Sequence, residues 1–129
     1  MRLFYLFLLA FICLAGCQPT DKAPALSLIL LNDAGLQLQL TPGNAPVETP
    51  LQLQLTAENL AGVSAQISGV SMYMGQIPLR FSQQGNSWQA EFLLGACSDP
   101  DMQWQLELEL TFINGEKRML IQQFQSSWR

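Results

Sequence analysis

Residues 102–112 read MQWQLELELTF, the longest stretch of the chain in which apolar and polar side chains alternate strictly. A period of two residues is typical of a β-strand with one face in a core and the other in water. Two shorter stretches, GLQLQLT at 35–41 and LQLQLT at 51–56, repeat the design with leucine on one side and glutamine on the other. These segments predict strands with buried leucine faces and exposed amide faces.

Further apolar segments of strand length occur around these three, at residues 25–31, 64–74, 77–81, 88–94 and 117–125. Residues that favour turns separate them, and no helical period of useful length appears after the first segment of the chain. Seven or eight short strands at roughly ten-residue spacing predict an all-β fold, an immunoglobulin-like antiparallel β-sandwich.

Single residues refine this expectation. Pro78 favours an edge strand, Gly69 interrupts its segment and suggests a bulge, and Asn114-Gly115 favours a two-residue type I′ hairpin turn. We expect Trp88 and Trp104 in the core, with Trp88 filling the space between the sheets.

The first residues have the pattern of an export signal. Arg2 precedes an unbroken apolar run, LFYLFLLAFI at 3–12, which is too short to span a bilayer as a helix. The following Leu14-Ala15-Gly16-Cys17 resembles the lipobox of bacterial lipoproteins, in which cleavage precedes a cysteine whose sulfur is then diacylated. An ordinary signal with a chance cysteine is the alternative.

The lipobox resemblance implies a division of the chain. Residues 1–16 would be the signal peptide, 17–24 the lipidated cysteine Cys17 and its tether, and 25–129 the sandwich domain. Gln18 stands where the inner-membrane retention signal has aspartate, so the resemblance implies the periplasmic face of the outer membrane rather than the inner. The membrane would then be one partner, reached through the acyl chains of Cys17.

Composition argues against several classes of function. After residue 16 the chain has five Lys and Arg against ten Asp and Glu, without a basic run, which argues against nucleic-acid binding. The sequence has no histidine, the usual general base, and no Gly-x-Ser-x-Gly motif, so we expect no enzyme. Asp99 and Asp101 flank a proline, but two carboxylates are fewer than a calcium site normally gathers.

Sulfur is the more informative chemistry. Cys13 leaves with the signal and Cys17 carries lipid, so Cys97 has no cysteine left to pair with. Met72 and Met74, two residues apart on an expected strand, would share a face, and Met102 follows the loop of Cys97. Thioethers and thiolates are soft ligands that prefer Cu(I).

Packing explains part of the same pattern. Methionine fills irregular cores, Met72 continues the apolar phase of Val70, and Met102 continues that of Trp104. Cys97 could also be buried or form a disulfide with another chain.

The stretch GVSMYMGQIPLRFSQQGNSWQAEFLLG at 69–95, followed by MQWQLELEL, resembles the YtkA-like and FixH-like family. These small periplasmic or membrane-tethered immunoglobulin-like domains are associated with copper handling and cytochrome oxidase maturation. The chain departs from the family pattern in its CSDPDM insertion and its lack of histidine. The resemblance favours Cu(I) binding by Met72, Met74, Cys97 and Met102, in support of copper delivery or oxidase assembly. The alternative is a metal-free binding or assembly module for an envelope protein complex.

Overall fold

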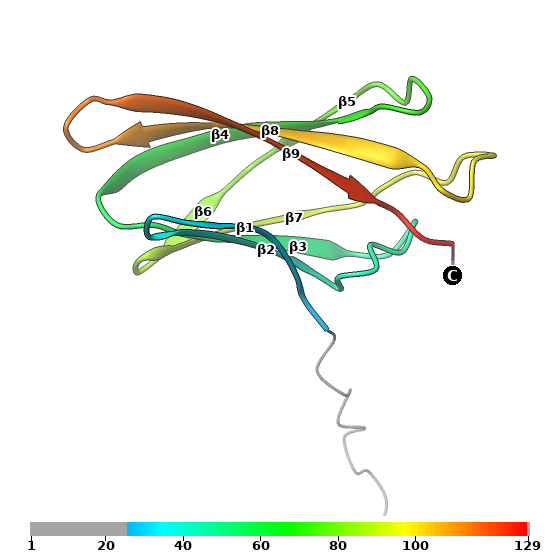
Figure 1. Ribbon diagram of the computed structural model, residues 1–129, viewed down its shortest axis with the longest axis horizontal. Coiled ribbons are helices and arrows are strands. Elements are labelled where there is room, and N and C mark those ends of the chain that lie inside the picture. The colour runs from blue at the N-terminus through cyan, green and yellow to red at the C-terminus, as the bar shows by residue number, and fades with distance from the viewer. Residues whose placement is uncertain (1–25, 129) are drawn as a thin grey trace, which may run out of the picture.

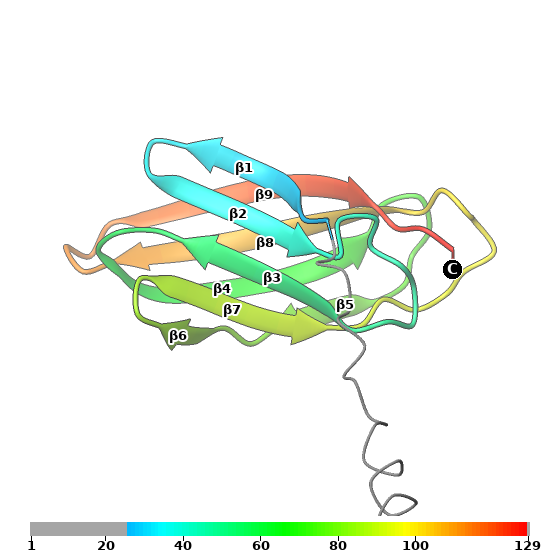
Figure 2. The same cartoon turned by 90° about the horizontal axis from the view of Figure 1, so that it is seen from below.

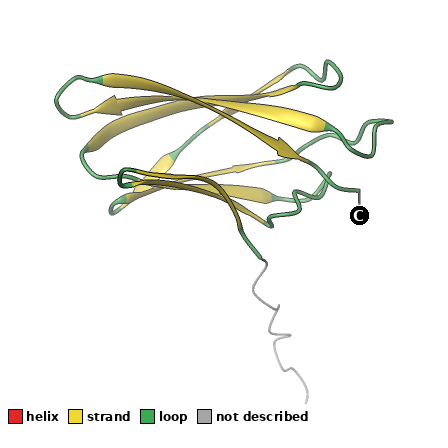
Figure 3. Cartoon of the chain, in the orientation of Figure 1, coloured by secondary structure: helices red, strands yellow, loops and turns green. Residues whose placement is uncertain are grey.

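The computed structural model describes residues 26–128, in which nine strands and no helix form two antiparallel sheets (Figures 1 and 3). The strands are β1 (Leu28–Asp33), β2 (Leu36–Thr41), β3 (Leu51–Thr56), β4 (Leu60–Gly69), β5 (Gln76–Leu79), β6 (Ser82–Gln84), β7 (Ser87–Phe92), β8 (Gln103–Phe112) and β9 (Lys117–Gln125). The predicted signal peptide, lipidated Cys17 and tether lie outside the described residues. Within residues 26–128, no helix has the length and hydrophobicity needed to cross a membrane.

The strand order is that of an immunoglobulin-like sandwich. The five-stranded sheet has the order β1-β2-β3-β7-β6 and the four-stranded sheet β5-β4-β8-β9, and the two stack face to face (Figure 2). The order β2-β3-β7-β6 corresponds to strands A, B, E and D of the immunoglobulin fold, and β5-β4-β8-β9 to C′, C, F and G. Strand β1 extends the first sheet beyond A. The predicted fold class is confirmed, with nine strands instead of seven or eight because β6 is too short to show alternation.

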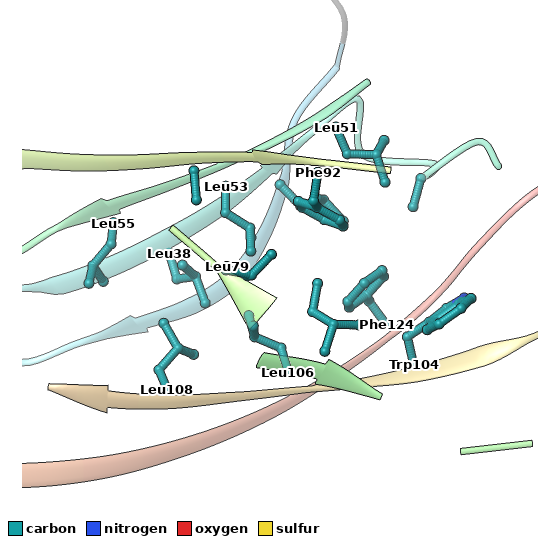
Figure 4. Close-up of a cluster of buried hydrophobic side chains, with 14 of the residues drawn as sticks. Leu38, Leu51, Leu53, Leu55, Leu79, Phe92, Trp104, Leu106, Leu108 and Phe124 are labelled. Atoms are coloured by element: carbon teal, nitrogen blue, oxygen red, sulfur yellow. The ribbon is translucent and has the colours of Figure 1, made fainter. Parts of the chain in front are cut away.

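The core follows the leucine periodicity. Leucines of β2, β3 and β8 point between the sheets and are fully buried, and Trp104 and Phe124 join them (Figure 4). The Trp104 indole N–H donates to Ser126 Oγ at 3.0 Å, and the Ser126 hydroxyl lies 3.4 Å from the Met102 carbonyl oxygen. Trp88 is only half-buried at the margin of this cluster. The expectation that Trp88 fills the space between the sheets is therefore wrong, whereas the expectation that Trp104 lies in the core is confirmed, since Trp104 is 1% exposed.

Of three local expectations, two are wrong and one is confirmed. Gly69 pairs in regular register with Trp104, and the register shift of β4 lies between Leu60 and Gly62, so no bulge occurs at Gly69. The β8–β9 connection is not a two-residue type I′ turn: the Phe112 N–H bonds the Glu116 carbonyl around a three-residue loop, 113–115. Gly115 adopts a positive φ of 85°, as in hairpins closed by a G1 bulge. Strand β5, which contains Pro78, lies at a sheet edge as predicted.

Candidate metal site at the loop end

One end of the sandwich is built by the β2–β3 loop (42–50), the β4–β5 loop (70–75), the β7–β8 loop (93–102) and residues 126–128; we call it the loop end. It lies on the right in Figure 1. Backbone hydrogen bonds join these segments. The Val70 N–H donates to the Gln103 carbonyl at 2.8 Å. The Glu48 N–H donates to the Leu94 carbonyl at 2.8 Å, and the Val47 N–H donates to the Ser127 carbonyl at 3.0 Å. The loops are therefore fixed relative to one another, which a site shared between them requires.

The four predicted sulfur ligands all lie at this end, but not for the predicted reason. Strand β4 ends at Gly69, so Met72 and Met74 lie in the β4–β5 loop and not on a strand. The inference that strand alternation puts both side chains on one face is wrong. Tertiary structure brings the β4–β5 and β7–β8 loops to the same end instead.

The Met102 side chain and the backbone carbonyl of Met72 both lie against Gly69. Met102 is 1% exposed, and its Cε lies 2.6 Å from the position that a Cβ on Gly69 would occupy. The carbonyl oxygen of Met72 also occupies that space. Ser71 Oγ accepts a hydrogen bond from the Gln103 N–H at 2.9 Å, which holds the reversing chain over the glycine. Glycine in a strand marks either a bulge or a close approach of another chain segment. At Gly69 it is the close approach of the following loop that requires glycine.

Met74 and Cys97 form the half-buried part of the set. Both pack against the edge of the core, and the Met74 Cε lies 3.4 Å from the place where a Gly95 Cβ would stand, two residues before Cys97. The Cys97 thiol lies 3.4 Å from the Asp99 carbonyl oxygen and donates to it. Met72 is 41% exposed. Solvent exposure therefore differs within the set: Met72 is the most exposed, Met74 and Cys97 are half-buried, and Met102 is buried.

The acidic residues of the β7–β8 loop have a local structural role. Asp99 Oδ1 accepts a hydrogen bond from the Asp101 N–H at 2.9 Å, as a turn aspartate does. Within residues 26–128, no three His, Cys, Asp or Glu side chains gather as a metal-binding group. A metal site at the loop end would depend on methionine sulfur.

Elsewhere, the outer face of the four-stranded sheet carries an amide network. Gln66 Nε2 and Gln105 Nε2 donate to the two carboxylate oxygens of Glu107 at 3.0 and 2.9 Å. These hydrogen bonds, from Gln66 first, lower the pKa of Glu107 because they favour the charged carboxylate. Composition alone did not single out this group.

A hollow of about 590 Å³ lies at the opposite end, between the β1–β2, β3–β4 and β8–β9 turns. Arg118 lines this hollow, and its guanidinium lies 3.6 Å from a carboxylate oxygen of Glu116 and 5.5 Å from the centre of the Phe112 ring. None of the predicted sulfur residues lines it.

The sequence matches no protein-family model, and no curated protein is similar to it. Among solved structures, the fold is similar to that of a DUF4785 family protein from Legionella pneumophila, with a TM-score of 0.53 and 17% sequence identity. The similarity covers 72% of this chain but only 28% of the Legionella protein. At that identity the likeness supports the fold alone.

Proposed function

We propose that the chain is a lipid-anchored envelope protein that binds Cu(I) through sulfur at its loop end. The observation that carries the proposal is the placement of Met74 and Cys97, half-buried residues of different loops, at the same end of the sandwich. The Met74 Cε lies 3.4 Å from the place where a Gly95 Cβ would stand, two residues before Cys97. A thioether and a thiolate are soft donors suited to Cu(I). Acylation of Cys17 would hold the domain at the membrane.

The remaining two sulfurs have different parts in this proposal. Met72 is partly exposed and would complete the ligand set from the outer side of the loop end. Met102 is sealed in the core and would ligate only after its side chain turns away from Gly69. Cys97 would lose its thiol proton, and with it the hydrogen bond to the Asp99 carbonyl, on binding the metal. Delivery to an envelope acceptor, in copper supply or cytochrome oxidase assembly, is the role that such a site would serve.

Competition titration tests the site. Residues 18–129, kept reduced, are titrated with Cu(I) against a chelator of known affinity. We expect Cys97→Ser and Met74→Leu each to weaken binding by more than about tenfold, equivalent to about 1.4 kcal/mol. Met119→Leu is the matched control, because Met119 is exposed on β9 away from the loop end. Unchanged affinity in the Cys97→Ser, Met74→Leu double variant would refute the ligand assignment.

A metal-free assembly module is the second candidate, and one observation favours it. Strand β9 is a nine-residue edge strand with Met119 and Ile121 exposed on its outer face, at 59% and 58%. Such an edge can accept a strand from an envelope partner. Strand β5 is a poorer acceptor, since it has four residues and contains Pro78. A photo-crosslinking residue at 121 should then capture a defined envelope protein that an equivalent residue at 83, on the short edge strand β6, does not.

A further inference from the structure

The N-terminal segment enters the sandwich at the loop end. The Gly43 N–H donates to the Leu26 carbonyl at 2.6 Å, and Leu28 then opens β1 opposite Leu40 at the end of β2. A Cβ on Gly43 would lie 2.7 Å from the Leu28 nitrogen, so the entering chain lies directly on the β2–β3 loop. Leu26, where the described chain begins, therefore lies at the loop end and not at the opposite turns.

Counted with Leu26, which lies against the β2–β3 loop, the same end carries more than half of the exposed large apolar side chains of the described chain. Six of the eleven are Leu26, Val70, Met72, Tyr73, Leu93 and Trp128. Tyr73 is 87% exposed at the apex of the β4–β5 loop, and Trp128 is 55% exposed beside the β2–β3 loop. Tyrosine and tryptophan are the residues enriched where a protein meets the membrane–water boundary, because their rings are apolar with one polar end.

Charge distinguishes this surface from a basic membrane-binding patch. The cations within residues 26–128 are Arg80, Lys117 and Arg118, and none belongs to the loop end. Its β7–β8 loop carries Asp99 and Asp101 instead. Within the described residues this end therefore offers no basic side chain to anionic headgroups, and the contact with lipid that these residues can make comes from apolar and aromatic burial.

We propose that the loop end rests on the lipid bilayer, with Tyr73 and Trp128 in its interfacial layer. The inference rests on the acyl anchor at Cys17 in the proposed function. Only eight residues, 18–25, separate Cys17 from Leu26, and even fully extended they reach about 28 Å. An anchor this short, joined to the domain at its apolar end, would keep this end towards the bilayer. We therefore assign lipid as the partner of this surface.

Site-specific fluorescence tests the orientation on the full chain, produced with its own leader in a bacterium that acylates lipoproteins. Tyr73→Cys, in a Cys97→Ser background, is labelled with an environment-sensitive fluorophore and reconstituted into phosphatidylcholine vesicles containing brominated lipid. The control is Ile113→Cys in the same background, because Ile113 is an apolar, 71% exposed residue in the β8–β9 turn at the opposite end. We expect quenching at 73 to exceed quenching at 113 by at least twofold.

Two further arms separate the outcomes. Raising salt should leave the quenching at 73 unchanged, and adding phosphatidylglycerol should not strengthen it; a salt-sensitive signal would overturn the apolar mechanism. Equal quenching at 73 and 113 in chains whose mass shows the acyl groups would refute the docking while the anchor stands. A mature mass without acyl groups would refute the anchor, and the docking with it. Protection of position 73 in cell envelopes but not in pure lipid vesicles would assign the surface to a protein partner instead.

Discussion

Replacement of Gly69 by alanine should destabilise the domain strongly, although the backbone there is ordinary β4 strand. The added methyl group would stand 2.6 Å from the Met102 Cε and would overlap the Met72 carbonyl oxygen. The methionine side chain can turn away, but the carbonyl belongs to the backbone of the reversing loop. The loop must therefore move away from β8.

The magnitude follows from what that movement breaks. Overpacking of a buried contact costs about 1–3 kcal/mol. Displacing residues 70–72 also strains the hydrogen bonds between Val70 N–H and the Gln103 carbonyl and between Gln103 N–H and Ser71 Oγ, each worth about 1 kcal/mol. We expect a loss of about 3 kcal/mol in the free energy of unfolding. For a domain of about 100 residues this lowers Tm by roughly 12–24 °C.

Urea unfolding of residues 18–129, followed by tryptophan fluorescence, measures the loss as a lower midpoint with an unchanged m-value. Gly62→Ala is the matched control, because Gly62 lies on the same strand and a Cβ there meets nothing within 4 Å. Adding Met102→Leu to Gly69→Ala should not restore stability, since the Met72 carbonyl remains in the way. If Gly69→Ala unfolds within about 0.5 kcal/mol of Gly62→Ala, the account of this contact is wrong.

Two other changes probe the polar groups of the sandwich. Ser126→Ala should cost about 1–3 kcal/mol, because it leaves the buried Trp104 indole N–H without its acceptor; Ser82→Ala, on an exposed strand, should be close to neutral in the same urea assay. Gln66→Ala should raise the pKa of Glu107 towards its ordinary value, which carbon-13 NMR of the carboxylate measures directly. Because the folded-state pKa is the lowered one, the stabilisation from Glu107 is present above about pH 4.5 and is lost as the pH falls through the folded pKa. The Gln66→Ala variant should therefore lose less stability than the parent over that acid range, and identical acid titrations would contradict this reading.

The strands themselves were largely predictable, because their alternation is strict. The segments 35–41, 51–56 and 117–125 coincide with strands β2, β3 and β9 to within a residue, and 102–112 with β8. The missed strand, β6, is three exposed residues paired only with β7, so it has no apolar period to detect. The strand predicted at 64–74 is observed as β4, Leu60–Gly69, because pairing with β8 sets where β4 ends. Strand β8 begins at Gln103, and the last residue pair between the two strands is Gly69 with Trp104.

The tryptophans and glycines illustrate what composition cannot settle. Both Trp88 and Trp104 lie on alternating strands, yet Trp104 is buried and Trp88 is only half-buried. Gly69 suggested a bulge, whereas the glycine accommodates the Met72 carbonyl and the Met102 side chain. The alternation pattern of the sequence predicts neither the contact of Gly69 with the Met72 carbonyl nor its contact with the Met102 side chain.

By itself the sequence determined which side chains face the core, because a period of two with leucine on one side permits only one orientation of each strand. It also restricts the donors available for a proposed metal site, since it offers sulfur and no histidine. Only the tertiary structure decided that Met74, Cys97, Tyr73 and the entering Leu26 lie at the same end. The physical reason is that strand order and direction choose which loops become neighbours, and both depend on the packing of two whole sheets.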